Sequence, residues 1–175
     1  MALVPMKKLL DDAVARNGAF GAFSVANMEM VDGTVRAAEE MQTDIVLQMD
    51  ESWFPAVPFR LMAPMMIRAA KEAKVNIAVH LDHGQSPRLI RKALKEGFTS
   101  VMFDGSTMPF RGNILRTREV VAAAGKYGAT VEAELGQIGN NDGRTSSAHR
   151  LKLTDPMDAL QFVQRTGVEI GRAHV

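Results

Sequence analysis

Short apolar runs alternate along the chain with longer segments of helical periodicity. Runs of this length, rich in β-branched residues, are typical of strands, and the segments between them are long enough for helices. The alternation predicts parallel strands joined by helices that cover the sheet, so each strand should read as a continuous apolar run. The five predicted strands lie at 19–25, 44–49, 75–81, 99–104 and 129–135.

Two of the segments between the strands contain residues that start and stop helices. At 86–97, Ser86 is a candidate N-cap, Pro87 suits the first helical position and Gly97 suits the end. The segment 155–167 repeats this order, with Asp and Pro at its start and Gly at its end. Both segments are therefore predicted helices.

Apolar spacing also predicts which helix faces are apolar. The segment 155–167 carries Met157, Leu160 and Val163 at three-residue spacing. Pro64 lies inside another helical pattern and is expected in its first turn or at a kink. The side chains expected to be buried on that second helix are Leu61, Met62, Met65, Met66 and Ala69.

No glycine-rich turn follows the first predicted strand. A doubly wound sheet normally has a G-x-G-x-x-G phosphate turn there, but the sequence reads FSVANMEM. A β/α barrel is therefore favoured. Such a barrel needs roughly 250 residues and this chain has 175, so we expect a (β/α)8 TIM barrel truncated after about the fifth β/α unit. The barrel domain is predicted to span 1–168, with a sixth strand beginning near Val168.

The composition narrows the classes of partner. The chain is 46% hydrophobic and has 21 basic and 20 acidic side chains, for a formal charge of +1. Neither sign forms a long run, which argues against nucleic acid or a membrane as partner and favours small molecules or proteins. Cysteine is absent, which excludes thiolate metal sites and disulfides. No apolar stretch is long enough to cross a bilayer, and a cytoplasmic location is expected.

Polar side chains gather where three consecutive predicted strands end. They are His80, Asp82 and His83 on the third strand, Asp104 on the fourth, and Glu132 and Glu134 on the fifth. In a β/α barrel the active site lies at the carboxyl ends of the strands. Alternation puts His80 and Asp82 on one face, and likewise Glu132 and Glu134. So many carboxylates at one rim favour a bound divalent metal.

Not every one of these residues needs a role in metal binding. His80 alone is interpreted as a buried hydrogen-bonding group, and Glu132 either joins the site or pairs with a basic side chain in the next layer. The set His83, Asp104 and Glu134 favours a metal site, because the three residues reach equivalent positions on adjacent strands. His149, in a polar loop, is expected to be solvated.

Three motifs carry a family resemblance. VHLDHGQSPRLIRKALKEGFTSVMFDGSTMPFRGN (79–113), VEAELGQIG (131–139) and LTDPMDALQFVQRTGV (153–168) closely resemble the zinc-dependent class II ketose-bisphosphate aldolases, which include the fructose- and tagatose-bisphosphate enzymes. The stretch 20–40 fits the same pattern more loosely. The resemblance implies a homo-oligomeric barrel enzyme that reversibly cleaves a ketose bisphosphate, a sugar-phosphate substrate, into dihydroxyacetone phosphate and an aldehyde.

The resemblance also implies roles for single residues. Asp82 resembles the family's catalytic proton donor and His83 its first zinc ligand, while Asp104 and Glu134 resemble the holders of an alternative, more buried metal position. Bound Zn²⁺ would stabilise the enediolate left by carbon–carbon cleavage. In the loop that carries the family's catalytic base, Asp142 is the candidate here.

The chain also departs from the family pattern. The remaining two histidine ligands of the family are expected beyond residue 168 and have no counterpart here, so the fragment is expected to be inactive. The tail 169–175, EIGRAHV, reads like a translated sequencing adapter and is expected to be non-native. The stretch 51–59 is unlike common members, which leaves the substrate preference open.

Two other functions remain open from the sequence. One is that of another metal-dependent TIM-barrel lyase or epimerase, which would share the carboxylates at the strand ends. The other is a non-catalytic, partner-binding role if 175 residues is the natural length, because an open barrel exposes sheet edges that a partner would cover.

Overall fold

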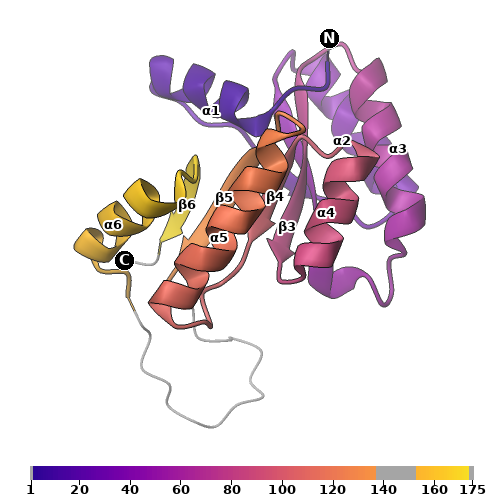
Figure 1. Ribbon diagram of the computed structural model, residues 1–175. Coiled ribbons are helices and arrows are strands. Elements are labelled where there is room, and N and C mark those ends of the chain that lie inside the picture. Colours follow the sequence, from indigo (N-terminus) through magenta and orange to yellow (C-terminus); the bar gives the residue numbers. More distant parts are fainter. Residues whose placement is uncertain (1, 137–152, 174–175) are drawn as a thin grey trace, which may run out of the picture.

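Six parallel strands form one curved sheet in the order β1 to β6. The computed structural model describes residues 2–136 and 153–173. All strands run from the end of the sheet near the N-terminus toward the opposite rim, and the sheet curves into a half-barrel (Figure 1). The strands are β1 (Ala22–Ser24), β2 (Ile45–Asp50), β3 (Ile77–Gly84), β4 (Ser100–Phe103), β5 (Thr130–Leu135) and β6 (Ile170–Ala173).

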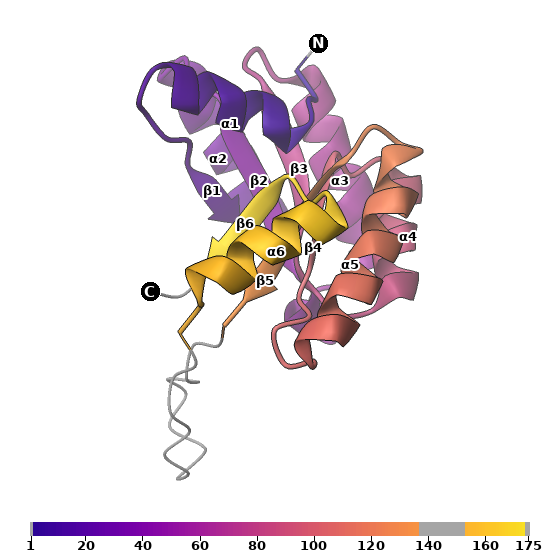
Figure 2. The same ribbon diagram turned by 60° about the vertical axis from the view of Figure 1, so that its left-hand side comes forward.

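The helices cover the outer face of this sheet, and the first of them lies across the end where the strands begin (Figures 1 and 2). No helix in the described part is both long and apolar enough to cross a membrane. The helices are α1 (Met6–Ala15), α2 (Met28–Glu40), α3 (Phe59–Glu72), α4 (Pro87–Glu96), α5 (Phe110–Gly125) and α6 (Pro156–Thr166), with a short 3-10 helix η1 (Glu51–Trp53) after β2.

The predicted βα alternation and all five predicted strands are confirmed. The expected sixth strand is also present and begins at Ile170. The six parallel strands of the described sheet are consistent with part of a TIM barrel.

The two faces of the sheet differ in character. Outward positions such as Leu47, Val79 and Val101 are apolar and pack into the main core beneath the helices. On the inner face, Val46 and Ala78 pack against the start of the chain, including Leu9 of α1. Farther along the strands the inner positions become polar. The expectation of continuous apolar strands therefore holds only for the outer face, because the inner face lines the barrel interior.

The predicted helix boundaries are confirmed. The hydroxyl of Ser86 accepts a hydrogen bond from the backbone N–H of Leu89 at 3.4 Å, and Gly97 ends α4 in the left-handed region at φ 101°. Asp155 caps α6 in the same way, and Gly167 ends it at φ 69°.

The predicted helix faces are only partly correct. In α3, Met62 and Met66 are buried, but Leu61 is 56% exposed. The apolar positions Met157, Leu160 and Val163 of α6 are 61%, 50% and 47% exposed, because the helix packs through other residues. One of these is Phe162, whose ring lies 6.1 Å from that of Phe110. Pro64 lies in the interior of α3, beyond its first turn.

Candidate functional site

The chain places its acidic and histidine side chains at the rim where the strands end. Asp50 ends β2, and Asp82 lies beside it in register on β3. Asp104 directly follows β4, and Glu134 is the second-last residue of β5. Because parallel strands end at one rim, residues distant in sequence converge there, as the sequence predicted.

A β-bulge in β3 brings His83 to this rim. Leu81 pairs with Val101 of β4 and Gly84 with Phe103, so β3 contains one extra residue between these pairs. His83 adopts φ 45°, in the left-handed region that non-glycine residues seldom occupy. Simple alternation would point Asp82 and His83 to opposite faces, whereas the bulge redirects His83 toward Asp104.

Gly84 permits this bulge. A Cβ atom at this position would lie 2.6 Å from the backbone carbonyl oxygen of Met102, too close for any other residue. The carbonyl of Gly84 accepts a hydrogen bond from the backbone N–H of Asp104 at 2.9 Å. The glycine therefore holds β3 and the residue after β4 close together.

His83, Asp104 and Glu134 form a compact group that could hold a metal ion. Each offers a ligand atom, and these atoms lie within 4.8 Å of one another. Nδ1 of His83 is 3.0 Å from Oδ2 of Asp104 and 3.8 Å from Oε2 of the buried Glu134. One imidazole and two carboxylates are ligands that Zn²⁺ and other divalent metals accept, so the donor set fits the predicted metal.

The hydrogen bond between His83 and Asp104 shifts the pKa values of both residues. It raises the pKa of His83 to about 8. Burial disfavours the Asp104 carboxylate, but hydrogen bonds from His83 and Ser106 outweigh it and lower the pKa of Asp104 to about 2. Asp104 is therefore ionised at neutral pH and available as an anionic ligand.

Asp82 lies between this group and β2. Its Oδ2 accepts a hydrogen bond from Nε2 of Gln48 at 2.8 Å, and its Oδ1 accepts one from the backbone N–H of His83 at 3.2 Å. Asp50, Asp82 and His83 form a second group whose ligand atoms lie within 4.8 Å. Burial raises the pKa of Asp82, and Asp50 adds to this while His83 opposes it.

A second polar layer lies beneath Asp82. His80 is 1% exposed; its Nδ1 is hydrogen-bonded to Oγ of Ser100 at 2.8 Å, and its Nε2 lies 3.5 Å from Glu132 and 4.0 Å from Asp82. Burial lowers the pKa of His80 to about 3 and, together with Asp82, raises that of Glu132 to about 7. The neighbour of Glu132 in this layer is thus an uncharged imidazole.

Arg172 brings a positive charge to the rim from the tail 169–175. Its Nη1 lies 2.9 Å from Nε2 of His83, and its Nε lies 3.8 Å from Oε2 of Glu134. The guanidinium group carries a positive charge. It therefore offsets part of the negative charge of the carboxylates at this rim.

Some predicted residues lie outside the described part of the chain. Conversely, some residues near the site were not predicted. Asp142 and His149 fall in the former group. Sequence reasoning missed Gln48 and Ser24, whose side chains hydrogen-bond to each other next to Asp82. The available signal was a glutamine that interrupts the apolar run DIVLQM.

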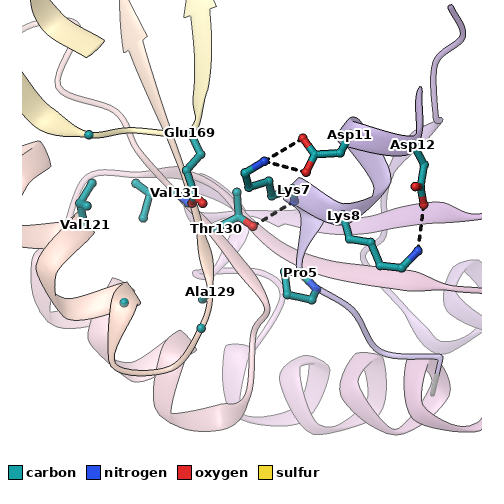
Figure 3. A pocket seen from close by; sticks show the side chains of 13 residues that line it. Pro5, Lys7, Lys8, Asp11, Asp12, Val121, Ala129, Thr130, Val131 and Glu169 are labelled. Carbon is teal, nitrogen blue, oxygen red and sulfur yellow. Dashed lines mark hydrogen bonds and ion pairs between the residues drawn. The ribbon is translucent and has the colours of Figure 1, made fainter. Parts of the chain in front are cut away.

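A separate cavity of about 630 Å³ lies at the opposite end of the sheet, between α1, α5 and the beginning of β5. Figure 3 shows that the charged side chains of α1 there pair with each other. Lys7 bonds to Asp11 at 2.6 Å and Lys8 to Asp12 at 2.8 Å. The residues that line this cavity do not include the acidic and histidine side chains at the rim where the strands end.

Known proteins resemble this chain both in sequence and in fold. The family model described as fructose-bisphosphate aldolase class-II matches residues 4–171. The fructose-bisphosphate aldolase of Thermus caldophilus is 40% identical over 180 residues, covering 98% of this chain and 58% of that protein. The sulfofructosephosphate aldolase of Alkalicoccus urumqiensis is 35% identical over 180 residues, covering 99% and 63%.

A solved structure agrees with the sequence relatives. The YdjI aldolase from Escherichia coli K12 has a TM-score of 0.87 and 32% identity, covering 99% of this chain and 62% of that one. The chain thus spans about three-fifths of the length of the relatives named here. By its family match, its relatives and its parallel half-barrel, this chain belongs to the class II fructose-bisphosphate aldolase family.

Proposed function

We propose that this chain is part of an enzyme that reversibly cleaves a ketose bisphosphate into dihydroxyacetone phosphate and an aldehyde. Membership of the aldolase family supports this reaction type. The observation that carries the proposal is the position of Asp82, a carboxyl group with a raised pKa, directly beside the group formed by His83, Asp104 and Glu134.

In this proposal Asp82 transfers the proton at the C4 oxygen. It accepts the proton from the C4 hydroxyl during cleavage and returns it to the aldehyde oxygen during condensation. A raised pKa suits this role, because general acid–base catalysis works best when the pKa of the group lies near the working pH. Asp142 is the proposed base that removes the proton from dihydroxyacetone phosphate.

His83, Asp104 and Glu134 are proposed to hold Zn²⁺, with the remaining histidine ligands beyond residue 168. When bound, the ion supplies Lewis-acid stabilisation of the negative charge that develops on the ketone fragment. The low pKa of Asp104 keeps this ligand anionic. In the described chain, Arg172 and any bound cation would both interact with the negatively charged carboxylates of this group.

The substrate is proposed to be a sugar phosphate. Relatives of similar identity are named fructose-bisphosphate aldolase and sulfofructosephosphate aldolase, so their names give two different sugar phosphates. We further propose a homo-oligomer, as the family resemblance implies, and a location in the cytoplasm.

Two substitutions in the full-length enzyme test the assigned roles. Asp82→Ala should lower turnover by about a hundredfold or more while leaving the metal content nearly unchanged, because it removes only proton transfer. His83→Ala should lower both turnover and metal content. Coupled detection of dihydroxyacetone phosphate and elemental analysis of the purified protein provide the two measurements.

The outcome can contradict either role separately. Normal turnover in Asp82→Ala would exclude Asp82 as the proton-transfer group. Full metal content in His83→Ala would exclude His83 as a ligand. Absence of ketose-bisphosphate cleavage by the wild-type full-length protein would refute the proposed reaction itself.

A further inference from the structure

Gln48 is a polar residue within an otherwise apolar stretch of β2. Its neighbours Leu47 and Met49 are completely buried on the outer face, whereas Gln48 points to the inner face and is partly buried. Burying an amide costs free energy unless its donors and acceptors find partners. A glutamine at this place therefore needs specific hydrogen bonds.

The side-chain amide of Gln48 connects three strands. Its Nε2 lies 3.1 Å from Oγ of Ser24 on β1 and 2.8 Å from Oδ2 of Asp82 on β3. Ser24 is the register partner of Gln48, but the register partner on β3 is His80. The amide is therefore fixed from one side and reaches diagonally toward the rim on the other.

The bond from Gln48 supplements a purely local contact of Asp82. The other carboxylate oxygen accepts a hydrogen bond from the backbone N–H of the next residue, His83. Asp50 lies close by in register, and its charge repels that of Asp82. Without Gln48, the Asp82 carboxylate would keep the local contact and the repulsion, but lose its tie to β2.

We propose that Gln48 is a positioning residue that fixes the orientation of the Asp82 carboxylate, and that Ser24 in turn fixes Gln48. This inference rests on the proposed function, in which Asp82 exchanges a proton with the substrate. A proton-transfer group must lie within hydrogen-bond reach of its target, and displacement by about 1 Å can cost about a hundredfold in rate. Gln48 acts through Asp82.

The orientation of Asp82 can be measured in the 175-residue chain without any turnover. Three-bond NMR couplings from the Asp82 carboxyl carbon to its backbone nitrogen and carbonyl carbon report the χ1 rotamer. We expect a single rotamer in the wild type and averaged couplings in Gln48→Met, which keeps the length of the side chain but removes its donors. Ser24→Ala should give partial averaging.

The control is Gln164→Met, the same substitution at an exposed position of α6. It should leave the Asp82 couplings unchanged. If Asp82 keeps a single rotamer in Gln48→Met, the positioning role is refuted, whatever the effect of that substitution on stability.

A kinetic cycle in the full-length enzyme tests the catalytic consequence. Gln48→Met should lower kcat about tenfold to a hundredfold with little change in KM. Asp82→Asn should lower it further, and the double variant should be no slower than Asp82→Asn alone, because residues that act as a unit have non-additive effects. Independent, multiplicative losses would overturn the proposal.

The two experiments separate this inference from the proposed function. A wild-type enzyme without aldolase turnover refutes the function, and the couplings of Asp82 still decide whether Gln48 positions it. Conversely, an active enzyme with an unchanged Asp82 rotamer in Gln48→Met refutes only the role of Gln48.

Discussion

The two histidines that flank Asp82 have opposite acid–base behaviour. His80 is enclosed by the barrel interior, and burial lowers its pKa to about 3. His83 lies at the rim, where the hydrogen bond with Asp104 raises its pKa to about 8. Two identical side chains three positions apart thus differ because burial dominates at His80, whereas the hydrogen bond with Asp104 dominates at His83.

The low pKa of His80 predicts a loss of stability in acid. In the unfolded chain the imidazole titrates near 6.5, so between pH 6.5 and about 3 the unfolded state binds the proton and the folded state does not. The free energy of unfolding should therefore fall as the pH falls through this range, by up to about 1.4 kcal/mol per pH unit. Urea titrations at several pH values measure it.

The His80→Gln variant provides the comparison, because it lacks this titration while the other groups remain. Between pH 6.5 and 4, the slope of its free energy of unfolding against pH should be smaller by the contribution of about one bound proton. Parallel curves for the two proteins would show that His80 does not titrate differently on folding.

Gly84→Ala should destabilise the chain by about 1–3 kcal/mol. The new methyl group would meet the backbone carbonyl of Met102 at 2.6 Å, which cannot move aside as a flexible side chain could. Gly33→Ala in α2 is the matched control, since its Cβ meets nothing within 4 Å. A Gly84 variant as stable as the Gly33 variant in urea unfolding would contradict the close approach described for β3 and β4.

At the scale of elements, the local sequence predicted which helices exist, and where they begin and end, better than it predicted which helix faces are buried. Ser86 and Gly97 mark α4 correctly because caps depend on adjacent backbone groups. The faces of α3 and α6 were not predictable from spacing alone, since neighbouring elements select the buried side. Leu61 and Leu160 are exposed for this reason.

The candidate site, like the helices, was predictable only in part. The positions of Asp82, His83, Asp104 and Glu134 at strand ends followed from the βα pattern. The bulge in β3 did not, because it is a matter of register between strands, and neither did the hydrogen bond of Gln48 across to β3. Contacts between strands require the folded register, which no local pattern specifies.

The cap of α6 gives a prediction at this scale. Asp155→Ala should lower the free energy of unfolding by about 0.5–2 kcal/mol, because the carboxylate accepts hydrogen bonds from the backbone N–H groups of Met157 at 2.7 Å and Asp158 at 3.4 Å. Chemical denaturation measures the change, with the exposed Gln164→Ala on the same helix as a control. Equal stability of the two variants would contradict the capping role.

For the whole molecule, the half-barrel leaves β1 and β6 with one strand neighbour each in the part of the chain described. The strand ends supply His83, Asp104 and Glu134, and the proposed further histidine ligands would come from the part of the relatives that this chain does not span. The described chain therefore supplies one part of the proposed metal centre.

The 175-residue chain alone should consequently show little or no aldolase turnover. One imidazole with two carboxylates holds catalytic Zn²⁺ less firmly than sites with two or three imidazole ligands, and Arg172 already neutralises part of the charge. A coupled aldolase assay with added Zn²⁺, repeated with a chelator, measures this. Robust turnover that the chelator abolishes would contradict the expectation.

The two ends of the described chain lie at opposite ends of the barrel, which matters for purification. Near the N-terminus, Val4 pairs with the start of β3 through a hydrogen bond to Ile77 at 3.0 Å. At the other end, β6 stops at Ala173, one residue after Arg172 contacts His83. A polyhistidine tag fused after β6 would bring foreign imidazoles to the candidate zinc ligands and distort every metal titration, so affinity tags belong at the N-terminus.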